Sequence, residues 1–340
     1  MREFVPRVDL VRSLHAQFIE NERESEYYEA PHRGHRLWPT EASVLWHAPD
    51  GTPILEGACR RKVVYRLRDT PRERTIKPEL TLKWRCGDWF EEHCLKASRA
   101  RGDLARAKVR IFDTSTCSLP ISGEIDAVNW INIDDETIYY PVDYKTAGEY
   151  WASSEILGNK SKLGKPKVEN LLQLMVYLDH DPRFPWGLLV YGIRDGWGMA
   201  QFQVELVNNP TNGTRCAKVN GVLYPQYTME SIIERYRQIC LYMDQNLLPI
   251  RDFDLHYTPQ RAKALFDLGR LAKGKWENIQ KGERFYKNVP IGDWQCSYCD
   301  YAQRCKEDGP GVEVCSEEKQ SDLLEQLHLM VQQQDPPPSS

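Results

Sequence analysis

Two short acidic segments hold the residues whose types and spacing could do chemistry. Gly-Glu-Ile-Asp occupies residues 123–126, and Pro-Val-Asp-Tyr-Lys occupies residues 141–145. Side chains two apart in a β-strand point to the same face, so a strand would place Asp143 beside Lys145. With Asp126 on a neighbouring strand, two carboxylates could hold a hard divalent cation and the lysine could orient a water beside a phosphate. The pattern predicts metal-assisted hydrolysis of phosphodiesters.

The surrounding sequence predicts a hairpin that pairs these two segments. By itself an Asp-x-Lys pair is usually a solvated strand face with a weak ion pair, so this context matters. Residues 121–133 and 138–145 are rich in β-branched and aromatic side chains, and a polar turn separates them. Pro141 inside the second strand indicates a bulge or an edge. Further strands are expected at residues 109–112, 188–193 and 201–207.

Two helices are expected beside the hairpin. Residues 168–180 predict a helix on which Gln173 and Tyr177, four apart, share a face. Residues 84–100 predict a second helix, which carries His93. Such residues are more often structural than functional. The functional alternative places Gln173 and Tyr177 near a metal or a phosphate and makes His93 a metal ligand.

These residues together resemble a known family. His93, the two acidic segments and Gln-Leu-Met-Val-Tyr at 173–177 occur in the order, and at similar spacing, of the RecB-like branch of the PD-(D/E)xK nucleases. The resemblance extends over roughly residues 53–306 and is to the iron–sulfur exonucleases of this branch, including the CRISPR-associated exonucleases and the AddB nuclease domain. It implies an α/β fold: a restriction-endonuclease-like mixed sheet flanked by helices, with a mainly helical cap that bears the cluster.

The resemblance also implies a role for each matched residue. Mg²⁺ or Mn²⁺ would be held by His93, Asp126, Asp143 and the backbone carbonyl of Tyr144. Lys145 would assist the attacking water, while Gln173 and Tyr177 would support the site and contact DNA. The implied activity is DNA hydrolysis, exonucleolytic on single strands or ends, that leaves a 5′-phosphate and a 3′-hydroxyl.

The cysteines predict a second metal site. The chain has ten cysteines, and three of them have metal-ligand spacing near the C-terminus: Cys296, Cys299 and Cys305. Three thiolates need a fourth ligand, and the resemblance implies Cys59, which precedes a basic, aromatic run, as in the iron–sulfur family. Cys86 and Cys94 are possible substitutes. A [4Fe–4S] cluster is expected, with structural zinc as the alternative, because both accept four thiolates.

Charge distribution suits a nucleic-acid partner. The formal net charge is −4, but residues 59–85 hold ten Lys or Arg against three acids, and residues 158–167 hold four lysines and no acid. Such segments predict a phosphate-lined track, and aromatic side chains beside them could stack on bases. The expected DNA contacts are Arg60, Arg61, Lys62, Tyr150, Trp151, Lys160, Lys162 and Lys165. Each segment alone is more often a solvated face.

Four parts are expected along the chain. They are an N-terminal extension (1–52, helical near 8–26), a nuclease core (53–225), a helical segment with the cysteine cluster (226–315, helices at 229–248 and 259–282), and a helix with a disordered tail (316–340). The charged first residues and the absence of an apolar membrane-spanning run predict a cytoplasmic protein with reduced cysteines. The resemblance implies a bacterial, archaeal or phage-infected cell.

The sequence leaves the partners and one rival function open. Recombination proteins or a CRISPR integrase are the partner proteins that the resemblance suggests, and an oligomer is compatible with the sequence. The rival function is a non-catalytic DNA-binding or scaffold protein with a zinc or iron–sulfur clasp. The presence of both acids and the lysine favours an enzyme.

Overall fold

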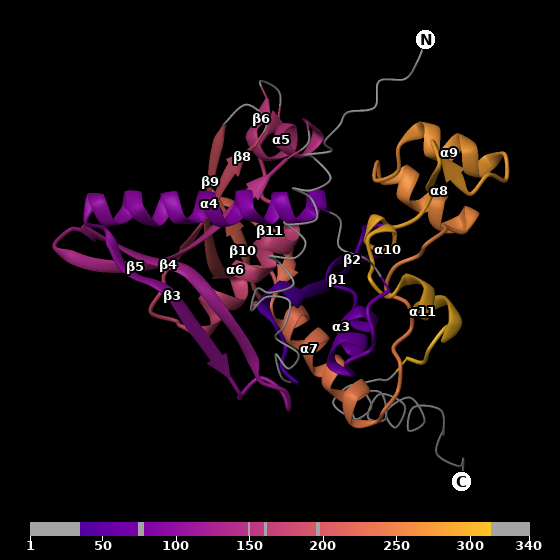
Figure 1. Ribbon diagram of the computed structural model, residues 1–340, viewed down its shortest axis with the longest axis horizontal. Coiled ribbons are helices and arrows are strands. Elements are labelled where there is room, and N and C mark those ends of the chain that lie inside the picture. The colour runs from indigo at the N-terminus through magenta and orange to yellow at the C-terminus, as the bar shows by residue number, and fades with distance from the viewer. Residues whose placement is uncertain (1–34, 74–77, 149, 160–161, 195–197, 314–340) are drawn as a thin grey trace, which may run out of the picture. The chain divides into compact units, whose positions relative to one another are not determined.

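The computed structural model describes residues 35–73, 78–148, 150–159, 162–194 and 198–313 (Figure 1). The chain divides into two compact units. The first unit holds the described residues of Met1–Ala58, Pro71–Ser115 and Leu119–Ile232. The second holds Cys59–Thr70, Thr116–Ser118 and the described residues of Ile233–Ser340. The helix expected near residues 8–26 and the helix and tail expected at 316–340 lie outside the described residues.

A seven-stranded sheet forms the centre of the first unit. In spatial order its strands are β11 (Val222–Thr228), β10 (Arg215–Val219), β9 (Met199–Asn208), β8 (Gly187–Ile193), β5 (Glu136–Ala147), β4 (Ile121–Ile133) and β3 (Leu104–Asp113). β5 and β8 run parallel, and the other neighbours are antiparallel. The five expected strands are therefore confirmed, most with longer bounds. This large mixed sheet flanked by helices is consistent with a restriction-endonuclease-like fold.

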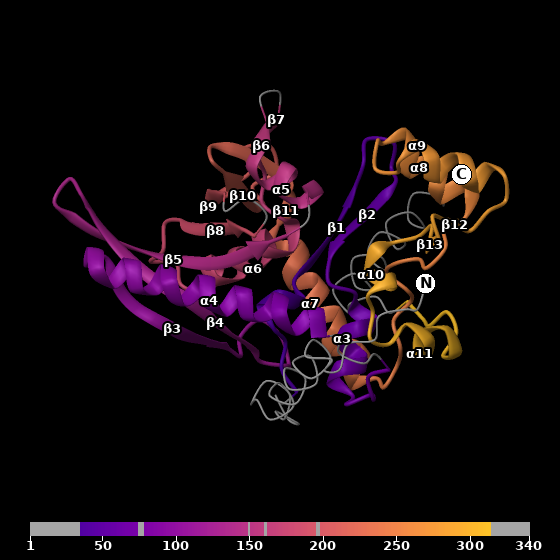
Figure 2. The same ribbon diagram turned by 45° about the horizontal axis from the view of Figure 1, so that its top comes forward.

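Two helices cover opposite faces of the sheet. A parallel strand pair needs a crossover connection, and α6 (Val168–His180) lies in the chain between β5 and β8, with the bounds that its periodicity predicted. α4 (Pro78–Arg101) lies along β3, β4 and β5 on the other face (Figures 1 and 2). Side chains alternate along β5, so Val142 packs with Leu95 of α4, whereas Asp143 faces α6.

Pro141 lies at an edge rather than in a bulge. The β4–β5 register continues without a shift through the Val128–Pro141 pair. Pairing of β5 with β8 begins only at Val142. The proline therefore lies where β5 has no partner strand on that side, and its missing N–H leaves the sheet intact.

Smaller elements complete the first unit. They are the 3₁₀ helix η1 (Pro39–Glu41), the hairpin of β1 (Ser43–His47) and β2 (Pro53–Gly57), helix α5 (Tyr150–Leu157), and the short pair β6 (Gly158–Asn159) and β7 (Lys162–Leu163). η1 packs on α6, which brings residues early in the chain to the same region as the β4–β5 hairpin. None of the described helices has both the length and the apolar character needed to cross a membrane.

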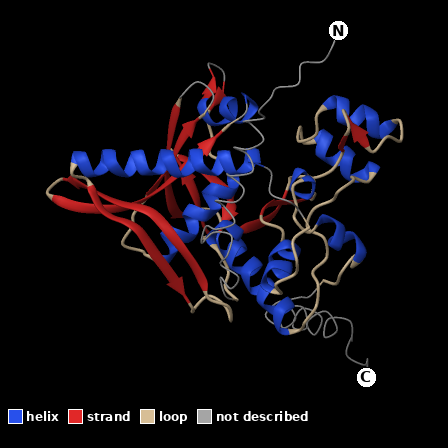
Figure 3. Ribbon diagram, viewed as in Figure 1, coloured by secondary structure: helices blue, strands red, loops and turns tan. Residues whose placement is uncertain are grey.

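The second unit is mainly helical (Figure 3). Its elements are α3 (Arg60–Leu67), most of α7 (Met229–Asp244), α8 (Pro259–Asp267), α9 (Lys273–Gln280), the pair β12 (Phe285–Tyr286) and β13 (Val289–Pro290), α10 (Trp294–Ser297) and α11 (Ala302–Glu307). α3 belongs to this unit, whereas the expected boundaries placed its residues in the nuclease core. The single helix expected at 259–282 is two helices, because Gly269 adopts a left-handed φ of +68° that ends the first.

Candidate active site

The two acidic segments meet in the first unit as the sequence predicts. Asp143 is fully buried, and its Oδ2 lies 2.7 Å from Lys145 Nζ on the same face of β5. Asp126 of β4 stands beside them, where its Oδ2 accepts a 2.8 Å hydrogen bond from the backbone N–H of Tyr144. Two carboxylates and a lysine from adjacent strands therefore share one location.

Gln173 and Tyr177 of α6 brace this group. The Gln173 amide donates to Asp143 Oδ1 at 3.3 Å and to the Tyr177 hydroxyl at 2.8 Å. The Tyr177 hydroxyl in turn donates to the backbone carbonyl of Glu124 at 2.9 Å. Gly123 allows this approach, because a Cβ there would lie 3.3 Å from Tyr177 Cε1 and 2.7 Å from a carbon of Pro39.

Glu91 of α4 joins the group, although the sequence motifs did not include it. Glu91 forms an ion pair with Lys108 of β3, which also lies 3.8 Å from Asp126 Oδ1. Burial and the charge of Asp126 raise the pKa of Glu91, and the charge of Glu91 contributes to raising that of Asp143. The signal was present in the sequence: Glu91 is four residues before the apolar Leu95 and shares its inward face.

His93 lies on the other side of the same helix. Two residues along an α-helix correspond to a rotation of about 200°, so His93 and Glu91 face opposite ways. A 2.8 Å hydrogen bond joins His93 Nδ1 to the carbonyl of Trp89, and the two rings lie 4.2 Å apart. Both side chains are exposed. The structure does not bring His93 to the carboxylates.

The site carries excess negative charge around a buried acid. Burial raises the pKa of Asp143, and Asp126 and Glu91 add to the rise, whereas Lys145 opposes it. Burial alone would lower the pKa of Lys145, but Asp143 and Asp126 raise it above its ordinary value. Lys145 is therefore a stable ammonium, while Asp143 gains from any further positive charge nearby.

The donor chemistry of the site suits a hard divalent cation. Glu91, Asp126 and Asp143 offer carboxylate oxygens, the ligands that Mg²⁺ and Mn²⁺ prefer. Apart from its ion pair with Lys145, Asp143 Oδ2 has no hydrogen-bond partner among the described residues, although it is buried. Within the described part of the chain, no three or more His, Cys, Asp or Glu side chains already stand at metal-binding geometry. The oxygen donors and the negative charge of the three carboxylates nevertheless suit a divalent cation.

Four of the cysteines gather in the second unit. Burial, the charge of Asp252 and the thiol of Cys299 raise the pKa of Cys59 to about 12. Burial likewise raises the pKa of Cys296, with contributions from each of the thiols of Cys59, Cys299 and Cys305. The thiols of the four predicted cluster cysteines are thus close enough to affect one another's pKa, although in the described residues no three of them stand at metal-binding geometry. The substitutes considered for Cys59, which are Cys86 and Cys94, lie on α4 in the first unit.

The structure buries two of the residues expected to contact DNA. The Arg60 and Arg61 side chains are 4% and 0% exposed. Arg60 pairs with Asp252 at 2.8 Å, and Arg61 donates to the carbonyl of Gly309 at 2.7 Å. Both guanidinium groups are buried within the second unit, so they contribute to the fold and are not exposed to a phosphate.

The other expected DNA contacts are exposed or lie outside what the structure describes. Lys62 and Lys165 are exposed and available to a nucleic acid. The side chains outside the described set are those of Tyr150, Trp151, Lys160 and Lys162.

A mixed sheet that carries cross-strand acids and an Asp-x-Lys pair, braced by a crossover helix, is the arrangement of a phosphodiester-cleaving core. Family comparison matches residues 44–306 to the PD-(D/E)XK nuclease superfamily, and the chain belongs to this superfamily. Membership implies a nuclease that hydrolyses phosphodiester bonds. Comparison with curated proteins gives no match. A solved structure titled "Crystal structure of SSO0001" is similar with a TM-score of 0.42 and 13% identity, covering 88% of this chain and 96% of that chain.

Proposed function

We propose that the protein is a Mg²⁺- or Mn²⁺-dependent deoxyribonuclease of the RecB-like branch. The observation that carries the proposal is the buried Asp143–Lys145 pair, with Asp126 and Glu91 beside it, in a chain of the PD-(D/E)XK superfamily. The proposed metal ligands are Glu91, Asp126, Asp143 and the backbone carbonyl of Tyr144. Glu91 takes the place first assigned to His93, because it is the acid that α4 turns toward the site.

Each residue has a task in this proposal. A bound cation would act as a Lewis acid toward the phosphate and lower the pKa of a water. The Lys145 ammonium would hold the attacking water and offset the negative charge that builds on the phosphate. Gln173 fixes the orientation of Asp143, and Tyr177 fixes Gln173 through the Glu124 carbonyl.

The finer proposal concerns the substrate. The order of the motifs supports an exonuclease that acts on single-stranded DNA or DNA ends and leaves a 5′-phosphate and a 3′-hydroxyl. The exposed Lys62 and Lys165 are available for the backbone phosphates. Recombination, repair and CRISPR spacer acquisition are the proposed settings, with recombination proteins or an integrase as partners.

Cleavage of end-labelled single-stranded DNA with Mn²⁺ tests the function. The wild type should cut, and Lys145→Ala should not, while Lys96→Ala, which alters an exposed lysine paired with Glu92, should cut like the wild type. Equal cutting by Lys145→Ala would contradict the site. Binding without cutting by every variant would favour the alternative, a non-catalytic DNA-binding scaffold.

We also propose that Cys59, Cys296, Cys299 and Cys305 hold a [4Fe–4S] cluster in the second unit. Their mutual effect on pKa supports the ligand set, since a cation would reverse the cost of forming buried thiolates. Iron and sulfide analysis of anaerobically purified protein tests this. Cys59→Ser should lose the iron, and Cys86→Ser should keep it. Zinc without iron would support a structural zinc clasp instead.

A further inference from the structure

Lys108 of β3 contacts three carboxylates of the candidate active site. Its Nζ forms an ion pair with Glu91 and lies 3.6 Å from Glu124 Oε1 and 3.8 Å from Asp126 Oδ1. The three acids come from α4 and β4, so a single ammonium links the helix to the strand. Lys145, the lysine of the superfamily motif, instead pairs with Asp143.

The backbone at Lys108 is strained. Its φ is +53°, in the left-handed region that residues with a Cβ rarely adopt, and it lies within a strand. The register pairs Ala107 with Ala127 and Val109 with Ile125, so Lys108 and Asp126 each lie between these two pairs. Such conformations persist when surrounding contacts over-determine them. The ion pairs of the ammonium are contacts of that kind.

The cation at this position is able to leave. The Lys108 side chain is 46% exposed, whereas that of Lys145 is 23% exposed. A lysine side chain is flexible and its ammonium is well solvated in water. Lys108 can therefore move its charge into solvent. Lys145 is more buried and is less able to do so.

Lys108 and a divalent cation would need the same oxygens. Glu91 and Asp126 are contacted by Lys108 and are also two of the proposed metal ligands. The described side chains of the group are four carboxylates, the ammonium groups of Lys108 and Lys145, and the Arg110 guanidinium, whose Nε lies 3.9 Å from Glu124 Oε2, so the acids outnumber the bases. Two cations a few ångströms apart repel each other, so a metal ion gains most when the ammonium withdraws.

We propose that Lys108 is a built-in counterion of the carboxylate group, which a divalent cation must displace. Lys108 then sets the metal concentration at which the site fills, and it is a positioning residue rather than a catalytic one. The inference rests on the proposed function, because it needs Glu91 and Asp126 to be metal ligands.

Mn²⁺ titration of the full chain without DNA tests the inference, with bound Mn²⁺ measured by electron paramagnetic resonance. Lys108→Gln removes the charge, and Lys108→Gly removes the charge and also relieves the left-handed strain. Both should bind Mn²⁺ about tenfold more tightly than the wild type, a change of about 1.4 kcal/mol. Comparing the two variants separates the effect of the charge on Mn²⁺ affinity from the effect of the backbone strain.

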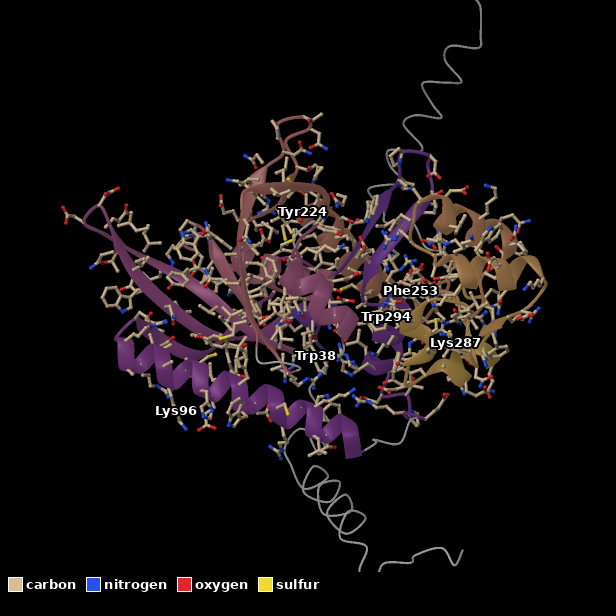
Figure 4. All side chains as sticks on the ribbon, turned by 90° about the horizontal axis from the view of Figure 1, so that it is seen from above. Trp38, Lys96, Tyr224, Phe253, Lys287 and Trp294 are labelled. Carbon is tan, nitrogen blue, oxygen red and sulfur yellow. The ribbon has the colours of Figure 1, made fainter. Side chains whose placement is uncertain are left out.

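The control is Lys96→Gln. Lys96 pairs with Glu92 at 2.7 Å on the outward side of α4 (Figure 4), so this variant removes a lysine–glutamate pair outside the site. Its Mn²⁺ affinity should equal that of the wild type. Asp143→Asn should weaken the binding and thereby locate it at the site.

The outcomes distinguish the inference from the proposed function. Unchanged or weaker Mn²⁺ binding in both Lys108 variants, with saturable binding by the wild type, overturns the counterion role and leaves the metal site standing. No saturable binding by any form overturns the metal site, and the counterion role with it. A melting temperature for each variant shows that the compared proteins are folded.

Discussion

Asp143 in the first unit and Asp252 in the second are both buried beside basic side chains, but their pKa values shift in opposite directions. Asp143 is 0% exposed and pairs with Lys145, and burial, helped by Asp126, raises its pKa. Asp252 is 3% exposed and pairs with Arg60 at 2.8 Å and with Arg235 at 2.5 Å. Burial alone would raise the pKa of Asp252, but the two guanidinium groups lower it.

The difference distinguishes two kinds of buried ion group. In a closed group the charges are balanced within the fold, whereas an open group keeps excess negative charge. Around Asp252 both arginines are 4% exposed, and Arg60 also lies 3.2 Å from Glu313 Oε1 and donates to the Gln238 side chain at 2.7 Å, so two carboxylates face two guanidinium groups. Around Asp143 acids outnumber lysines, and one oxygen lacks a hydrogen bond among the described residues. A closed group serves the fold, whereas an open group favours another cation.

The largest expected effect is on the closed group. Asp252→Asn should lower the free energy of unfolding of the second unit by about 3–5 kcal/mol, because it removes the buried carboxylate that two buried guanidinium groups share. Chemical denaturation and limited proteolysis measure this. Asp267→Asn, at an exposed helical pair with Lys263, should cost under about 0.5 kcal/mol. Equal losses in the two variants would show that the Asp252 group is not structural.

Asp143→Asn should have the opposite profile. We expect DNA cleavage to fall by roughly 100- to 1,000-fold, because a charged group at the reacting centre is lost. The free energy of unfolding should change by less than about 1 kcal/mol, since the amide keeps the shape and relieves a buried charge. Steady-state cleavage and denaturation of the same preparation measure both. A cleavage rate within tenfold of the wild-type rate would show that Asp143 is not part of the active site.

The two aspartates should also give opposite pH slopes in metal-free protein. Because the pKa of Asp143 is raised, its stabilising contribution is present below the ordinary value of 3.8 and is lost as pH rises toward the raised pKa. Because the pKa of Asp252 is lowered, its contribution is present above 3.8 and is lost as pH falls. Each slope is at most about 1.4 kcal/mol per pH unit. The differences from Asp143→Asn and Asp252→Asn across pH measure them, and slopes of equal sign would refute the comparison.

The smallest expected effect tests whether Glu91 or His93 belongs to the open group around Asp143. Glu91→Gln should lower cleavage about tenfold, or about 1.4 kcal/mol, because it removes one proposed metal ligand. His93→Gln should stay within about twofold, because that side chain is exposed on the other side of α4. Cleavage rates at limiting Mn²⁺ compare the two. A larger loss in His93→Gln would restore the histidine as the ligand.

Much of the fold and half of the site follow from local patterns. The β4–β5 hairpin, the bounds of α6 and the facing of Asp143 and Lys145 depend on residue alternation, helical periodicity and a polar turn, all of which lie within a few residues. Gln173 and Tyr177 share a face because they are four apart. These are short-range properties of the backbone, so the amino-acid order alone is sufficient to state them.

The remaining features depend on contacts between segments far apart in the chain. The rotation of α4, which selects Glu91 over His93, is set where Phe90 packs against Gly192, since a Cβ there would lie 2.6 Å from the ring. Arg60 is buried because Asp252, 192 residues away, accepts its hydrogen bonds. A basic side chain has the same local pattern whether it meets solvent, a phosphate or a buried carboxylate. Burial and charge balance are sums over all neighbours, and those neighbours exist only once the chain has folded.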